Sequence, residues 1–295
     1  MRFPMPNSRR PGGRGPLWKA LLAAMALLWG VSGCQFIVRP TADQEAETLP
    51  SSPWRIATSW GAAPLVEELL RAYQTQGHGA NAEVIPCGDR RAEEMLTSGE
   101  AEMAFVMRPA PLATGRGNAS EQVREIPLAY GGLALIVHPS MPLAQIAPED
   151  LAALYEGFIV DWSTLGGSAG PPEIISRPEG DIAREIFERA VMPGRPLTSA
   201  ALLLPHDQAV LDYVSTHPLA IGYVAHALVD ERVKVISLGG FLPSVHTLEQ
   251  GRYPLTFTLA LLTRAETPAE ATRFASFVRG SRAQRIIAER YVPAR

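Results

Sequence analysis

The residues of this chain best suited to chemistry lie between positions 174 and 187, around an arginine, a glycine and an aspartate. Residues 174–176 read as a short strand, Arg177 to Gly180 as a tight turn, and the residues from Asp181 as the start of an amphipathic helix. The first N–H groups of a helix form an anion site, and Arg177 would supply a counter-charge. Asp181 is also a good N-cap residue, so its own carboxylate could satisfy these groups. The turn therefore predicts either an anion site or a self-capped helix.

Other combinations of reactive residues are weak. The six histidines are scattered, without a pair at metal-ligand spacing. Ser168 lies in a G-x-S-x-G sequence, but Pro171 and Pro172 follow, whereas a hydrolase nucleophile elbow needs a helix after the serine. We therefore expect no catalytic residues, no metal site and no cofactor.

The N-terminal segment predicts export. Residues 1–33 contain five basic residues and no acid, followed by an apolar run at 20–31 that is too short to span a bilayer. This pattern predicts a secretory signal peptide over 1–33, with an uncleaved anchor as the alternative. Residues 34–53 are polar, acidic and without periodicity, as in a linker. The folded body is then extracytoplasmic and tethered to the cell membrane.

Charge and cysteine content exclude several classes of protein. The chain has 27 basic and 30 acidic residues. Without the five basic residues of the signal, 22 basic residues remain, so the mature charge is −8. A nucleic-acid partner would require a basic face and is not expected. Cys34 and Cys87 are the only cysteines, which excludes a disulfide framework.

The elements that position the turn alternate between strand and helix. This order predicts an α/β fold with a mostly parallel sheet, whose ligands bind beyond the carboxyl ends of the strands. Gly131 and Gly132 separate two strand segments and indicate a crossing into a second sheet. We expect strands at 55–58, 83–86, 102–107, 126–128, 133–138, 174–176, 219–224, 232–238 and 256–262. We expect helices from Pro64, at 90–96, 148–155, from Asp181 to about Val191, and at 207–215, 268–278 and 281–291, and a loop at 112–123.

Three segments together resemble the phosphate-binding lipoproteins of ABC transporters. LYEGFIVDW at 154–162 is similar to the family's I-F-x-G-x-I-x-x-W, AIGYV at 220–224 to its A-I-G-Y-V, and GRYPL at 251–255 to its G-x-Y-P-L. Val31 to Cys34 also resembles the lipobox, which implies lipidation of Cys34. The resemblance implies the type 2 periplasmic-binding-protein fold, with two α/β lobes joined by crossing strands. Lobe 1 would comprise 54–129 and 252–295, and lobe 2 would comprise 130–251.

The resemblance also implies a ligand site, from which this chain departs. The family sequence R-x-x-G-S-G-T matches at Arg177 and Gly180, but Asp181, Ile182 and Ala183 replace Ser, Gly and Thr. Met107, followed by Arg108, stands where an acceptor aspartate is expected. The implied ligand-binding residues are Ser59, Trp60, Gly61, Gly88, Asp89, Met107, Arg108, Arg177, Gly180, Asp181, Ile182 and Ala183.

Two of these positions carry aspartates where hydroxyl donors are expected. A like-charge pair ~4 Å apart costs ~4 kcal/mol at an effective dielectric constant of about 20, more than one good hydrogen bond returns. Asp181 and Asp89 would therefore repel a phosphate held at hydrogen-bond distance.

Three interpretations follow. In the first, which we favour, the protein is a solute-binding protein with an ABC permease as its partner. Arg177, Arg108 or Arg90 would pair with Asp181 and Asp89, and the ligand would differ from free phosphate, being cationic or zwitterionic for example. In the second, the cleft is self-capped and the protein is a sensor or a partner-binding lipoprotein. The third, an extracytoplasmic hydrolase, lacks a catalytic constellation.

Overall fold

A computed structural model describes residues 53–77, 81–110 and 123–294 of the chain. All of them belong to one compact unit, Pro50–Arg295. The predicted signal peptide, Cys34 and nearly all of the predicted linker lie outside the described residues.

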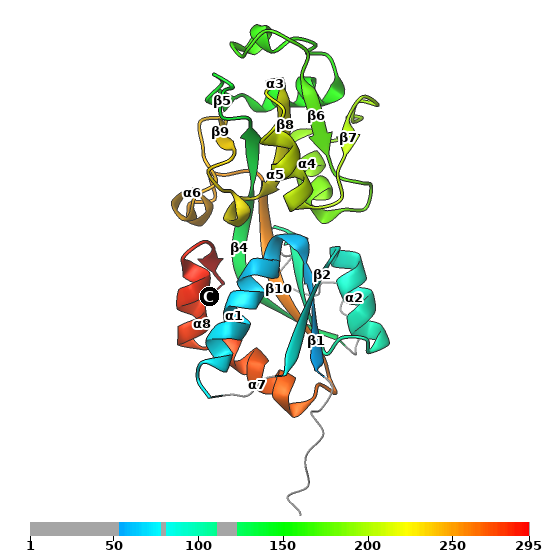
Figure 1. Ribbon diagram of the computed structural model, residues 1–295, viewed down its shortest axis with the longest axis vertical. Helices are drawn as coiled ribbons and strands as arrows, with labels where there is room; N and C mark the ends of the chain where they lie inside the picture. The colour runs from blue at the N-terminus through cyan, green and yellow to red at the C-terminus, as the bar shows by residue number, and fades with distance from the viewer. Residues whose placement is uncertain (1–52, 78–80, 111–122, 295) are drawn as a thin grey trace, which may run out of the picture. The chain divides into compact units, whose positions relative to one another are not determined.

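The chain begins with alternating strands and helices (Figure 1). Strand β1 pairs in parallel with β2 on one side and with β3 on the other. Ile56 of β1 packs in the cluster that contains the apolar face of α1, whereas Ala57 packs with Ala92 and Leu96 of α2. Because successive strand side chains point to opposite faces, α1 and α2 cover opposite faces of the sheet. The bounds are β1 (Trp54–Ser59), η1 (Trp60–Ala62), α1 (Ala63–Gln74), β2 (Ala82–Cys87), α2 (Asp89–Ser98) and β3 (Met103–Pro109).

Two long strands connect this part of the sheet to the next. Strand β4 (Val123–Val137) pairs with β10 (Thr256–Arg264) along residues 123–132 and with β8 along residues 133–137. Strand β10 also pairs with β3. We call β2, β1, β3, β10 and residues 123–132 of β4 the first half-sheet, and residues 133–137 of β4 with its neighbours the second half-sheet.

The second half-sheet continues from β4 through β8 and β6 to β7, with β9 beside β4. Ile174 of β6 packs on the side of α4 with Phe187, whereas Ile175 packs with Val210 of α5. Helices thus cover both faces here as well. The bounds are β5 (Gln145–Ile146), α3 (Pro148–Glu156), η2 (Trp162–Leu165), β6 (Glu173–Ser176), α4 (Ile182–Val191), β7 (Leu202–Leu203), α5 (Asp207–Val214), β8 (Ala220–Ala225), η3 (His226–Leu228), β9 (Lys234–Leu238) and α6 (Val245–Glu249).

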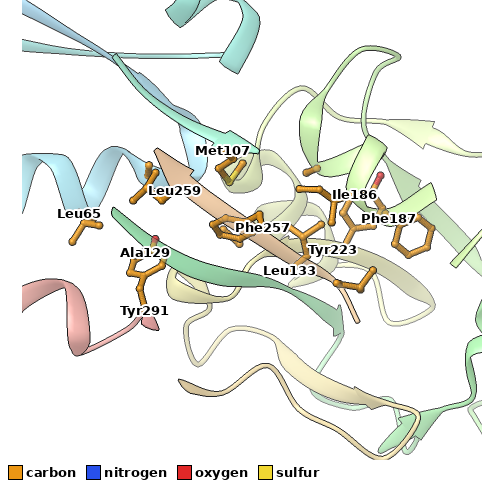
Figure 2. Packing of buried hydrophobic residues seen from close by; sticks show 14 of the residues in the cluster. Leu65, Met107, Ala129, Leu133, Ile186, Phe187, Tyr223, Phe257, Leu259 and Tyr291 are labelled. Atoms are coloured by element: carbon orange, nitrogen blue, oxygen red, sulfur yellow. The ribbon is translucent and has the colours of Figure 1, made fainter. Parts of the chain in front are cut away.

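The C-terminal segment returns to the first half-sheet. Helices α7 (Ala269–Val278) and α8 (Ser281–Ala288) pack on α1, and β11 (Val292–Pro293) pairs with β4. Phe274 of α7 contacts Trp54 and Tyr73, with ring centroids 5.7 and 5.3 Å apart. The largest apolar cluster extends along both half-sheets. Figure 2 shows Phe257 of β10 between Leu259 of the same strand and Tyr223 of β8.

Three features differ from the prediction. The sheet is parallel within the βαβ units, but the pairs that β4 and β10 make are antiparallel, because these strands cross between the half-sheets. Gly131 and Gly132 lie inside one continuous strand, not in a break. Helix α6 was not predicted, although Ser244 and Thr247 form a capping box at its start. The predicted loop at 112–123 lies outside the described residues except for Val123.

Gly131 is required by the ring opposite it. A Cβ at Gly131 would lie 2.4 Å from Cζ of the buried Phe257. We predict that Gly131→Ala lowers the free energy of unfolding by about 1–3 kcal/mol through overpacking. In a Phe257→Leu background, which removes the ring, the same change should cost clearly less. Denaturant unfolding of the four proteins measures this coupling, and equal costs in both backgrounds would contradict it.

Candidate ligand-binding site

A cavity of about 550 Å³ lies between residues of the two half-sheets. On the first side it is lined by the start of α2 and the end of β3, including Asp89 and Arg108, and by Glu125 of β4. On the second side it is lined by the turn before α4 and its first residues, including Gly180 and Ile182. Both predicted binding turns, 88–89 and 177–183, therefore border one space.

Asp181 caps α4 with its own carboxylate. Its Oδ1 accepts hydrogen bonds from the N–H groups of Ala183 (2.9 Å) and Arg184 (3.4 Å). Gly180 precedes it with φ 81°, a conformation that favours glycine. Burial raises the pKa of Asp181 above its ordinary value, although Arg177 and the two N–H groups favour the ionised form. Of the two predictions for this turn, the self-capped helix is the one these hydrogen bonds form.

Arg177 forms a buried ion pair with a residue that sequence reasoning missed. Its Nη2 lies 2.8 Å from Oδ2 of Asp207 at the start of α5, and each residue is 2% exposed. Oδ1 of Asp207 accepts a hydrogen bond from the N–H of Ala225 at 2.8 Å. The guanidinium is therefore already neutralised. Asp207 was predicted only as a helix start, although that helix follows β7, a strand parallel to β6 at the same sheet edge.

Asp89 links α2 to β3. Its Oδ1 accepts a hydrogen bond from the N–H of Met107 at 2.5 Å. Burial raises the pKa of Asp89 to about 7; the charge of Asp181 acts in the same direction, while the Met107 N–H and Arg108 oppose it. The two carboxylates that begin α2 and α4 thus interact unfavourably when both are ionised.

The predicted pairing of arginines with these aspartates is wrong. Arg108 pairs with Glu93 (2.7 Å) and Glu125 (3.3 Å), because the end of β3 runs beside α2 and β4, which carry these glutamates. Arg90 pairs with Glu94 on the exposed face of α2. Within the described part of the chain, no arginine forms an ion pair with Asp89 or Asp181.

The turn after β1 carries three of the predicted ligand-binding residues, none of which is among the lining residues of this cavity. Ser59 is fully buried, and its Oγ makes no hydrogen bond with any described residue. The Trp60 ring contacts that of His206, which precedes α5, with centroids 5.0 Å apart. A Cβ at Gly61 would lie 3.1 Å from Cβ of Ala225 and 3.3 Å from Sδ of Met107. This close approach explains the glycine. Gly88 is the exposed N-cap residue of α2.

Tyr223 is a further residue beside the site that was not singled out, although the AIGYV segment contains it. Its hydroxyl and that of Ser176 are 2.9 Å apart, and its ring stacks on Phe187 with centroids 4.5 Å apart. Among the described residues there is no group of three or more His, Cys, Asp or Glu side chains placed to hold a metal ion.

Comparisons with known proteins agree on a family. The model of a family described as a PBP superfamily domain matches residues 41–282. Phosphate-binding protein PstS of Bacillus subtilis is 25% identical over 169 residues, which cover 56% of each chain. Phosphate-binding protein PstS of Borreliella burgdorferi is 22% identical over 180 residues, which cover 56% of this chain and 64% of that protein. The chain thus spans about three-fifths of the length of these relatives.

A solved structure matches over a longer stretch. The phosphate-bound crystal structure of a phosphate ABC transporter substrate-binding protein from Clostridium perfringens has a TM-score of 0.75 and 22% identity. The match covers 83% of this chain and 100% of that one. Together with the family model, it confirms the predicted α/β fold of the type 2 periplasmic binding proteins.

The Asp89 carboxyl should make stability depend on pH. Its pKa of about 7 in the fold exceeds the ordinary 3.8, so the stability it contributes is complete below pH 4 and is lost as pH rises to 7. The loss amounts to at most about 4 kcal/mol. Asp89→Asn keeps an oxygen for the Met107 N–H but has no charge. The gap in melting temperature between this variant and the wild type should therefore widen from pH 4 to pH 8 in favour of the variant. A gap independent of pH would contradict the raised pKa.

The ion pair of Arg177 and Asp207 should be costly to break from either side. Arg177→Gln or Asp207→Asn alone leaves a buried charge without its partner and should cost about 3 kcal/mol. The double variant should cost clearly less than the sum of the two single changes. Denaturant unfolding checks this, and additive costs would show that the pair is not coupled.

Proposed function

Because this chain belongs to the PBP superfamily, we propose that it is an extracytoplasmic substrate-binding protein of a phosphate-type ABC importer. Its partners are then a small solute and the transporter permease. The similarity to phosphate-binding proteins supports this function. The observation that carries it is the cavity between the half-sheets, where turns 88–89 and 177–183 meet.

The predicted lobes fit this function. We place lobe 1 at 54–129 with 252–295, and lobe 2 at 130–251, with β4 and β10 as the crossing strands. The antiparallel pairing of β4 with both β10 and β8 supports this division. The twelve residues predicted from the resemblance remain our proposal for the ligand site, and we add Asp207 as the buried partner of Arg177.

In this proposal the protein does not bind free phosphate at neutral or basic pH. The N–H groups at the start of α4 already donate to Asp181, and the charge of Arg177 is paired with Asp207. A phosphate dianion would then meet two carboxylates, while Arg177 and Arg108 already pair with other carboxylates. At ~4 Å each ionised carboxylate costs ~4 kcal/mol at an effective dielectric constant of about 20.

We also propose that a lipid on Cys34 holds the protein at the cell membrane. The basic segment, the short apolar run and the lipobox-like sequence before Cys34 support this placement. In the described part of the chain, no helix is long and apolar enough to cross a membrane.

A second candidate function is a sensor or partner-binding lipoprotein that kept the fold without transport. The carboxylate cap of α4 favours it, because Asp181 itself accepts the N–H groups that a bound anion would use. We expect no catalysis. Ser168 is followed by strand β6 and not by the helix that a nucleophile elbow requires.

Calorimetric titration with phosphate at pH 8 tests the proposal. The wild type should bind no tighter than millimolar. The combined variant Asp181→Ser, Ile182→Gly and Ala183→Thr frees the helix N-terminus and removes one carboxylate, so its affinity should increase at least tenfold. Glu149→Gln, an exposed change in the first turn of α3, is the control and should leave binding as in the wild type.

Micromolar binding by the wild type at pH 8 would refute the claim about the ligand. No gain in the combined variant would refute the solute site. Capture of a protein partner by a chain that fails a broad solute screen would favour the second candidate.

A further inference from the structure

Two carboxylates from opposite half-sheets lie close enough for the charge of Asp181 to act on Asp89. Asp89 begins α2 and Asp181 caps α4, and each uses Oδ1 to accept backbone N–H groups. Gly180 and Ile182, on either side of Asp181, line the same cavity as Asp89.

The cations around this pair are engaged elsewhere. Arg177 pairs with Asp207, Arg108 with Glu93 and Glu125, and Arg184 with Glu188. The titratable and charged groups that border Asp89 and Asp181 are Arg90 and Glu93 of α2, Cys87 of β2, Arg108 of β3, Glu125 of β4, Arg177, Tyr223 of β8, Arg184 and Glu185 of α4, and Asp207.

For two neighbouring carboxyl groups, the state in which one is protonated is favoured over the state in which both are ionised. Like charges in a partly buried site raise each other's pKa, and burial adds to the effect. The pKa of Asp89 at about 7 agrees with this arrangement. A protonated carboxyl group has an O–H that donates a hydrogen bond, whereas an ionised one only accepts.

Two buried donors near this cavity, although not among its lining residues, lack acceptors: Ser59 pairs in register with Cys87, two residues before Asp89, and Arg177 acts electrostatically on Asp181. Ser59 is fully buried and Arg177 is 2% exposed, and neither Oγ of Ser59 nor Nε of Arg177 makes a hydrogen bond with a described residue. Ser59 alternates with Thr58 along β1, so its side chain points to the face of Ala57, which is covered by α2. Buried polar groups without partners are rare, and a ligand, an ion or an ordered water can supply the missing partner. Two donors without acceptors indicate a ligand that is rich in acceptors.

We propose that Asp89 makes anion binding in this cleft depend on a proton: a tetrahedral oxyanion binds together with one proton, taken from solvent, that resides on Asp89. In the protonated form Oδ2–H donates to the anion beside Ser59 and Arg177. In the ionised form the carboxylate repels the anion. The inference rests on the proposed solute site and adds its regulation by pH. Met107 stands where the resemblance implies an acceptor aspartate, and its side chain has no carboxylate to accept a hydrogen bond from the anion. The anion itself therefore does not need to carry a proton.

Sulfate is the probe, because its charge stays constant over the range tested, so that any pH dependence reports the protein. We titrate the purified protein with sulfate by calorimetry at pH 6, 7, 8 and 9. Affinity should be level below about pH 7 and fall about tenfold per pH unit above it, the slope for one linked proton. At pH 8, buffers of different ionisation enthalpy should report uptake of about one proton per sulfate, and at pH 6 close to none.

Variants of Asp89 isolate the source of the proton. Asp89→Asn supplies an amide donor and keeps the acceptor for Met107, so its sulfate affinity should be independent of pH. Asp89→Ser supplies a hydroxyl and should behave alike, which guards against a folding defect in one variant. Glu149→Gln should keep the wild-type slope.

Three results would overturn the proposal. The first is that the wild type fails to bind sulfate at pH 6, and the second is that it binds sulfate equally well at pH 6 and pH 9. The third such result is a sulfate affinity that falls with pH in both Asp89 variants as it does in the wild type. The solute site itself is judged separately, by phosphate binding to the combined variant of Asp181, Ile182 and Ala183 at pH 8.

Discussion

A guanidinium that is almost fully buried requires a carboxylate beside it, and the contact between Arg177 and Asp207 meets this requirement. The pair joins the end of β6 to the start of α5 and holds the turn before α4 in place. It also offsets part of the arginine's charge, although Arg177 still favours the ionised form of Asp181. Asp181 and Asp89 form no ion pair with an arginine in the described part of the chain, because Arg177 pairs with Asp207 and Arg108 pairs with Glu93 and Glu125.

The N-termini of α2 and α4 also carry aspartates in place of a bound anion. The starts of α2 and α4 point toward one cavity, an arrangement that normally favours anions. Here the first residue of α2 and the cap of α4 are both aspartates. Each aspartate stabilises its own helix and opposes an external anion. At α4, Asp181 and an external anion compete for the same N–H groups, whereas Asp89 accepts the N–H of Met107 and opposes an anion through its charge when it is ionised.

Much of the fold could be predicted because its signals are local. The apolar face of α1, the glycine that ends α2 and the alternation of strands with helices specify βαβ units. The continuity of β4 could not be predicted from Gly131 and Gly132, because it depends on Phe257, which is 126 positions away in sequence and covers the first of them. The direction of β10 depends likewise on partners far along the chain.

The sequence singled out a turn that borders the cavity, but it did not indicate how the charged side chains pair. Arg177, Gly180 and Asp181 indicate a binding turn by their own chemistry. Sequence does not reveal which carboxylate a given arginine reaches, since Asp207 and Glu125 come from distant elements. The pairs expected for Asp89 and Asp181 were therefore wrong, and that error concerns the central property of the site, its uncompensated negative charge.

The most direct test of this account is the titration of the Asp89 carboxyl in the ligand-free protein. Carbon-13 NMR can follow its carboxyl carbon from pH 3 to pH 9, with Asp89→Asn identifying the signal. An uncompensated, buried carboxyl group opposite Asp181 should titrate with a midpoint near 7. A midpoint near the ordinary value of about 4 would show that a cation or solvent reaches Asp89, and would contradict the account.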